Sequence, residues 1–232
     1  MTVEAVIFDW GGTLTPWNSV EPRESWLAFA RAVHDDPAHA DEVAAALLGA
    51  EQKRWATVLD DHRAFTTAQV LADAAITGDP AALDAYKEFW VQVSHVRPEA
   101  APVLDELRGQ GLRLGLLSST HWPRDWHEEW LARDGLLERL DACVWSSDLP
   151  YTKPHRTAFL VAMEAVGVTD PSTCVYVGDR LFDDVHGAQA AGMRAVLVPH
   201  SDVPAHQVVA VDVTPDAVLD RLSDLPGIIA TW

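Results

Sequence analysis

Residues 3–14 read Val-Glu-Ala-Val-Ile-Phe-Asp-Trp-Gly-Gly-Thr-Leu. A short apolar run leads into a carboxylate, Asp9, which is followed by the glycine pair Gly11 and Gly12. Such a continuous apolar run is typical of a strand buried on both faces of a parallel sheet. Glycines after a strand permit an unusual backbone and the close approach of a ligand. The stretch therefore predicts a strand that ends in a functional Asp, although an Asp that only caps the turn is a simpler alternative.

Four further apolar runs are similar to the first in length and composition. Helical patterns of crossover length separate the later runs, and two of these patterns end in Gly167 and Gly192, as helices commonly do. This alternation of strand and helix predicts an α/β fold with a Rossmann-like parallel sheet. The expected strands are 3–8, 112–118, 141–146, 173–178 and 194–198, and the expected helices between them are 122–133, 157–166 and 184–191.

The interval between the first two strands is far longer than one crossover needs. Residues 17–95 are therefore expected to form an inserted all-helical domain, and residues 1–16 and 96–232 the Rossmann-like core domain. One more helix is expected in the C-terminal part, over 215–223. Within the insertion, the helical patterns cover 24–34, 40–59, 67–75 and 81–95.

The charge balance limits the classes of partner. The 232 residues carry a formal net charge of −18, and only three of the basic residues are lysines. Duplex nucleic acids and anionic membranes both require a basic surface, so we expect neither as a partner. No run reaches the ~18 apolar residues of a membrane helix, and the N-terminus opens directly into the first strand without a signal segment. We expect a cytoplasmic protein that is a monomer or a homodimer.

Polar residues also follow the other predicted strands. Ser118 ends the second strand, Lys153 follows the third, and Asp179 ends the fourth, shortly before the acidic pair 183–184. Parallel strands end along one edge of a sheet, so these side chains can converge with Asp9. Each has a simpler explanation alone: a helix cap for the serine, solvation for the lysine, and the helix dipole for the acids. Four such strand ends in succession favour a catalytic site.

This order of motifs resembles the haloacid dehalogenase-like (HAD) hydrolase superfamily, over residues 3–15 and about 100–200. The helical insertion looks like the C1-type cap of that superfamily. The resemblance implies a Rossmann-like core, a Mg²⁺ cofactor and a phosphatase that acts on a small phosphorylated metabolite. By position, Asp9 is similar to the family's nucleophile and Lys153 to its third-motif lysine.

The residue types suit that chemistry. A carboxylate such as Asp9 can attack phosphorus and form an aspartyl-phosphate, which water then hydrolyses. Lys153 would hold the Asp9 carboxylate and the phosphoryl oxygens. His121 and His155 lie beside the motifs and could donate a proton, but we expect both to be solvated loop histidines. The resemblance implies Mg²⁺ ligands at Asp9, the Gly11 carbonyl, Asp179 and Asp184, with Asp183 able to replace Asp184, and phosphoryl-binding groups at Ser118 and at the backbone N–H groups near Ser119 and Gly12.

Gly11 departs from the family pattern, which has a second Asp there as general acid and base. A glycine cannot protonate a leaving alcohol, and such assistance is typically worth about 10²–10⁴ in rate. A cap group or a water could supply the proton, the leaving group could need none, or the protein could be a catalytically weakened member that binds a phosphorylated ligand or a partner.

Two other reactions of the superfamily bear on this departure. A phosphonate (P–C) hydrolase is an alternative, because such enzymes have a similar Asp-Trp-Ala-Gly-Thr motif with a cap lysine. Lys53 and Lys87 are the only lysines of the insertion here. Dehalogenases also lack the second Asp, but they typically lack the metal-binding acids that residues 178–184 retain.

Overall fold

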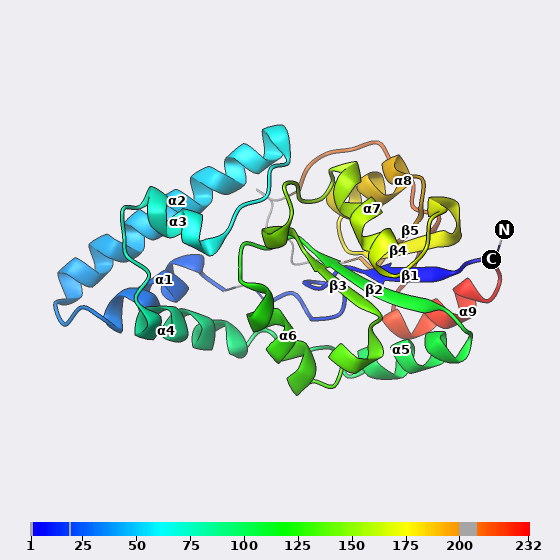
Figure 1. The fold of residues 1–232 in the computed structure, drawn as a ribbon, viewed down its shortest axis with the longest axis horizontal. Helices are drawn as coiled ribbons and strands as arrows, with labels where there is room; N and C mark the ends of the chain where they lie inside the picture. The colour runs from blue at the N-terminus through cyan, green and yellow to red at the C-terminus, as the bar shows by residue number, and fades with distance from the viewer. Residues whose placement is uncertain (1, 19, 200–207) are drawn as a thin grey trace.

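A six-stranded parallel sheet forms the centre of the computed structural model, which describes residues 2–18, 20–199 and 208–232 (Figure 1). The strand order is β3-β2-β1-β4-β5-β6, so β1 lies in the interior between β2 and β4. The predicted α/β fold with a Rossmann-like parallel sheet is confirmed, and all five predicted strands are present. The strands are β1 (Ala5–Phe8), β2 (Arg113–Ser118), β3 (Ala142–Trp145), β4 (Cys174–Gly178), β5 (Arg194–Leu197) and β6 (Ala217–Val218).

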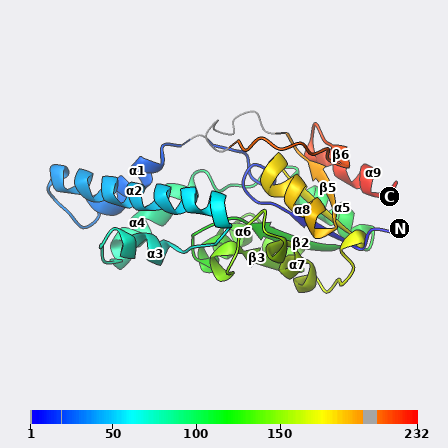
Figure 2. The same ribbon diagram turned by 90° about the horizontal axis from the view of Figure 1, so that it is seen from above.

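Both faces of the sheet are buried, which explains why its central strands lack polar alternation. In β1, Val6 and Phe8 enter one hydrophobic core while Ala5 and Ile7 enter the other. Helices α7 (Arg156–Ala165) and α8 (Gly187–Ala191) cover one face, and α5 (Ala100–Gly109), α6 (Arg124–Arg133) and α9 (Leu225–Ile229) pack on the other (Figures 1 and 2). A strand covered on both sides must be apolar throughout.

Four helices lie beyond the carboxyl ends of the strands, at one end of the molecule (Figure 1). Local sequence explains where they begin: the Asp36 and Asp79 side chains cap the two longest, and each is followed by a proline in the first helical turn. No helix among the described residues is both long and apolar enough to cross a bilayer. The four helices are α1 (Pro22–Arg31), α2 (Pro37–Asp61), α3 (Thr67–Asp73) and α4 (Pro80–Val91).

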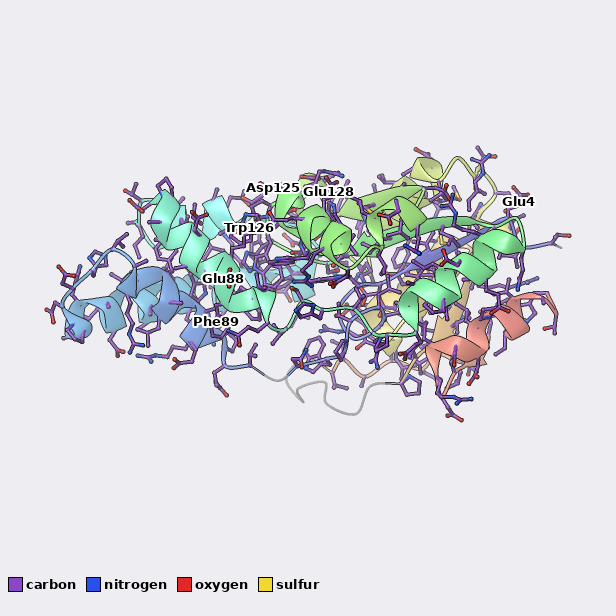
Figure 3. All side chains as sticks on the ribbon, turned by 90° about the horizontal axis from the view of Figure 1, so that it is seen from below. Glu4, Glu88, Phe89, Asp125, Trp126 and Glu128 are labelled. Atoms are coloured by element: carbon purple, nitrogen blue, oxygen red, sulfur yellow. The ribbon has the colours of Figure 1, made fainter. Side chains whose placement is uncertain are left out.

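The four-helix segment packs against the sheet-bearing part through helix α4 and through the chain between α2 and α3, among other contacts. Helix α4 lies beside α6 (Figure 3), and the rings of Tyr86 and Trp126 meet with their centroids 6.1 Å apart. Between α2 and α3 the chain runs along the loop that precedes Lys153. There Ala64 donates its N–H to the Pro150 carbonyl at 3.1 Å, and the loop returns a second backbone hydrogen bond to residue 62. The segment is thus held next to the edge at which the predicted site lies.

The expectation of a helix over 215–223 is wrong. Residues Ala217 and Val218 form β6 and pair with Val196 and Leu197 of β5. The edge of β5 would otherwise leave backbone groups without partners, and satisfying them outweighs the weak helical preference of this short stretch. A short 3₁₀ helix over Leu222–Asp224 leads into the α-helix of this region, which begins at Leu225.

Candidate active site

Asp9 lies directly after β1, at the carboxyl edge of the sheet. Its backbone N–H donates to the Val177 carbonyl at 2.8 Å, which extends the pairing of β1 with β4 and brings Asp9 towards Asp179. Gly12 has a φ of +87°, and a Cβ atom at this position would overlap with the Asp179 carboxylate. Only glycine combines this left-handed backbone with so close an approach. The turn after Asp9 is therefore shaped to lie against Asp179.

Lys153 links two of the acids. Its Nζ donates to Asp9 Oδ1 and to Asp184 Oδ1, at 2.6 Å each, and to the Tyr176 hydroxyl at 2.9 Å. Burial by itself would lower the pKa of Lys153, but the charges of Asp184 and Asp9 outweigh it and raise the pKa well above its ordinary value. Lys153 is therefore a permanent cation in contact with the predicted nucleophile.

Three buried acids converge at this edge. Asp9, Asp179 and Asp184 each present a carboxylate oxygen, and these oxygens lie within 4.8 Å of one another. Both oxygens of Asp179 are buried and have no hydrogen-bond partner among the described residues.

Burial raises the pKa of Asp179 to about 8, and the charges of Asp184 and Asp9 contribute to the shift. Burial also raises the pKa of Asp9 to about 6, although Lys153 opposes it. Carboxylates held together without enough cationic charge suit a divalent cation with oxygen ligands.

The adjacent acids Asp183 and Asp184 differ in their surroundings. Asp184 is buried, and besides its contact with Lys153 it accepts the Arg180 backbone N–H on Oδ2 at 2.9 Å. Asp183 instead lies 3.4 Å from the Arg180 guanidinium and is not part of the described three-acid cluster. The resemblance implied Asp184 as the ligand, with Asp183 able to replace it, and the structure brings Asp184 to Asp9 and Asp179.

The two serines lie at the end of β2, at the same edge of the sheet as the acids. Ser118 is the last residue of β2 and is buried. Ser119 Oγ accepts a hydrogen bond from Thr152 Oγ1 at 2.7 Å, which ties the segment after β2 to the segment that carries Lys153. No hydrogen bond among the described residues joins Ser118 or Ser119 to the acidic cluster.

Gly11 lies in open space. A Cβ atom added there would meet no heavy atom within 4 Å, and its φ lies outside the left-handed region that Gly12 occupies. The backbone therefore does not require glycine at this position. What the site lacks here is a side chain, and there is room for its Cβ atom.

The expectation that His121 is a solvated loop histidine is wrong. Its side chain is buried, with Nε2 3.3 Å from Glu51 Oε1 and Nδ1 3.0 Å from Thr67 Oγ1. The four-helix segment packs over this loop, which a local sequence pattern cannot reveal. His155 is half-buried and caps α7 by accepting the Thr157 N–H at 3.2 Å.

Sequence reasoning missed two residues that shape the site. Tyr176 contacts Lys153 through its hydroxyl. The sequence could have indicated this role, because a tyrosine inside a fully buried strand needs a hydrogen-bond partner for its hydroxyl. Arg97 donates to the carbonyls of Gly12 and Thr13, at 3.2 and 3.1 Å, and so fixes the turn after Asp9. Nothing in the local sequence separates Arg97 from an ordinary surface arginine.

Comparison with known proteins identifies relatives that are named as phosphatases. Over 149 residues, 64% of this chain, the sequence is 31% identical to the glyceraldehyde 3-phosphate phosphatase of Methanopyrus kandleri, and the match spans only 63% of that relative's length. A phosphatase of Mycobacterium tuberculosis is 27% identical over 241 residues, which cover 99% of this chain and 98% of the relative.

Solved structures share the fold along the whole chain. An HAD phosphatase from Thermococcus onnurineus superimposes with a TM-score of 0.67 at 24% identity, covering 98% of both chains. A 2-haloacid dehalogenase from Pseudomonas syringae pv. tomato does so with a TM-score of 0.64 at 27% identity, covering all of both chains.

The family profile agrees with the site. The profile that matches residues 3–192 is described as haloacid dehalogenase-like hydrolase. Its span contains the three-acid cluster, Lys153 and both serines. These residues occur in the order of the family's motifs, and Asp9, Lys153, Asp179 and Asp184 lie together at one edge of the sheet. The chain therefore belongs to the haloacid dehalogenase-like hydrolases.

Proposed function

We propose that this hydrolase is a Mg²⁺-dependent phosphatase that acts on a small phosphorylated metabolite through an aspartyl-phosphate on Asp9. One observation carries the proposal: Lys153 contacts Asp9 and Asp184 at 2.6 Å, while Asp179 beside them keeps two buried oxygens without a partner among the described residues. A protein that only binds a ligand has no need for this arrangement. Relatives named as phosphatases of glyceraldehyde 3-phosphate and of phosphoserine support the substrate class.

Asp9 would act as the nucleophile. Its carboxylate attacks phosphorus, the ester P–O bond breaks, and the leaving group departs with a proton from water or from the four-helix segment, since Gly11 has none to give. Water then attacks phosphorus, the bond to Asp9 breaks, and phosphate leaves. Lys153 neutralises the Asp9 carboxylate during attack. The phosphoryl oxygens would be bound by Ser118 and the backbone N–H groups near Ser119 and Gly12.

The acids also fit a resident Mg²⁺. The free oxygens of Asp179 are the groups that most need a cation, and Asp9, Asp184 and the Gly11 carbonyl would complete the protein ligands. When bound, the ion supplies positive charge that offsets the repulsion between an anionic nucleophile and an anionic substrate. Lys153 and the turn fixed by Arg97 would keep Asp9 oriented independently of it.

We further propose that residues 17–95 act as a C1-type cap domain on the core of 1–16 and 96–232. The positions of the four helices beyond the strand ends, and the contacts of Glu51 and Thr67 with His121, support this role. Substrate selection would then depend on this segment. We also propose that the protein is cytoplasmic, is a monomer or a homodimer, and binds no nucleic acid.

A substrate screen tests the function. We expect phosphate release from small phosphomonoesters with Mg²⁺ and none after chelation. Including 2-chloropropionate tests the reaction named for the dehalogenase neighbour, and we expect no chloride release. Chloride release without metal would contradict the proposal. The absence of turnover on a broad panel would favour the alternative of a ligand-binding member.

Mg²⁺ binding should be linked to protons. The raised pKa values of Asp179 and Asp9 mean that the metal-free site holds protons that the ion must displace. Mg²⁺ affinity should therefore rise with pH between about 6 and 8, by up to about tenfold per pH unit for each proton released. Titration calorimetry in two buffers of different ionisation enthalpy measures both the Mg²⁺ affinity and the number of protons released. An affinity independent of pH in this range would contradict the assignment.

The same pKa shifts predict the stability of the metal-free protein. The folded state binds more protons than the unfolded chain, so the contribution of these groups to stability is present at low pH and is lost as pH rises towards 8. The melting temperature of the metal-free protein should fall as the pH rises from about 4, the ordinary pKa of a carboxyl group, towards 8. Adding Mg²⁺ at pH 8 should restore the melting temperature. Thermal melts with and without chelator measure the difference.

Gly11→Asp should increase turnover of substrates whose leaving group is a basic alkoxide. A general acid matters most for such groups, and restoring one should raise kcat by about 10²-fold or more. The gain should be small for p-nitrophenyl phosphate, because its phenolate leaves without much protonation. Gly11→Ala is the matched control, since it adds a Cβ in the same open space without an acid. Equal effects of both variants on both substrates would show that Gly11 does not limit proton delivery.

A further inference from the structure

Lys153 uses all of its hydrogens. A lysine ammonium has three donors, and these bind Asp9 Oδ1, Asp184 Oδ1 and the hydroxyl of Tyr176. The first two acceptors are carboxylates, which attract the ammonium by charge. The third is a neutral phenol, and its contribution is geometric, because it sets the direction in which the ammonium faces the two acids.

Tyr176 is itself fixed from two sides. Its hydroxyl donates to the Leu117 carbonyl at 3.0 Å while it accepts from Lys153. Its ring is fully buried and meets the Phe159 ring of α7 edge-on, with the centroids 4.9 Å apart. Strand β4 carries Tyr176 and strand β2 carries Leu117, so the hydroxyl bridges the two neighbours of β1. The residue after Leu117 is Ser118.

We propose that Tyr176 is a positioning residue that holds the Lys153 ammonium on Oδ1 of Asp9 and so leaves Oδ2 to react with phosphorus. Among the described residues no hydrogen bond is found to Asp9 Oδ2. Because the same hydroxyl also binds the Leu117 carbonyl, it fixes the position of Lys153 relative to the next residue, Ser118, which is the proposed phosphoryl ligand. The role in turnover rests on the proposed function.

Tyr176→Phe tests this role because it removes one oxygen and keeps the ring. We expect kcat to fall about 10- to 100-fold, the range for losing a hydrogen bond to a charged group, with KM changed less than about twofold. In a Lys153→Met background the same substitution should cause no further loss. Tyr86→Phe is the matched control: Tyr86 is equally buried and its hydroxyl accepts from Trp122 Nε1 at 3.2 Å, away from Lys153.

A second measurement does not depend on turnover. The chain has only three lysines, so ¹⁵N-lysine labelling gives three ammonium signals, and Lys153→Met identifies the one that disappears. We expect the Lys153 ammonium to exchange slowly with water in the wild-type protein and in Tyr86→Phe, and at least about tenfold faster in Tyr176→Phe, which loses that hydrogen bond. A wild-type protein without phosphatase activity would refute the proposed function only. Unchanged exchange in Tyr176→Phe, or an equal loss of kcat in the Lys153→Met background, would overturn the role of Tyr176.

Discussion

Asp9→Asn should abolish turnover, with a loss of at least about 10⁴-fold, the scale seen when a nucleophile is removed. The amide has the shape of the carboxylate but cannot form an acyl phosphate, so no covalent route remains. The fold should persist, because the amide oxygen can still accept a hydrogen bond from Lys153, and Lys153 keeps its contact with Asp184. Steady-state kinetics and circular dichroism measure the two effects.

The matched control for Asp9→Asn is Asp183→Asn. Asp183 belongs to the same acidic motif but pairs with Arg180 outside the three-acid cluster. We expect this variant to keep most of the wild-type kcat. Wild-type turnover in Asp9→Asn would exclude the covalent mechanism, and an equal loss in both variants would indicate a general effect of charge.

Asp179→Asn should have opposite effects on activity and on stability. Activity at a fixed, sub-saturating Mg²⁺ concentration should fall by about 10³-fold, because the variant lacks the ligand whose oxygens are otherwise unpartnered and the ion supplies several kcal/mol of transition-state stabilisation. The metal-free variant should melt at a higher temperature than the metal-free wild type at pH 8, since a buried, uncompensated carboxylate has been removed. Added Mg²⁺ should then raise its melting temperature little.

The combination of lower activity and a higher melting temperature distinguishes a metal ligand from an ordinary buried acid. If Asp179 only stabilised the fold, its substitution would lower the melting temperature with and without metal. Retained Mg²⁺-dependent activity together with a lower melting temperature would contradict the assignment of Asp179 as a ligand.

The parts of the site that the sequence predicts are those set by the ends of parallel strands. Asp9, Ser118 and Asp179 each terminate or directly follow a short buried strand, and parallel strands end along one edge whatever lies between them. Lys153 follows its strand by several residues, yet the motif order was enough to place it. The motif also named Asp184 ahead of Asp183, and in the structure the one-residue shift along the helical turn leaves Asp183 outside the cluster.

The parts that sequence reasoning missed depend on contacts between distant segments. The weak pattern over 215–223 forms a strand because the edge of β5 offers it partners, and no local property signals that edge. His121 is buried by Glu51 and Thr67 of the four-helix segment, which lie far away in sequence. Gly11 and Gly12 cannot be distinguished in the sequence, where they are adjacent glycines. Only their φ angles and neighbours show that Gly12 must be glycine while Gly11 need not be.

Chemical trapping tests most directly whether Asp9 forms an aspartyl-phosphate during turnover. The enzyme is mixed with Mg²⁺ and a phosphomonoester that it turns over, quenched rapidly in acid, and reduced with borohydride, which converts an acyl phosphate of aspartate into homoserine. Peptide mass spectrometry then locates the product. We predict homoserine at Asp9, none at Asp179 or Asp184, and none without substrate. Turnover with unmodified Asp9, or homoserine at another acid, would contradict the mechanism.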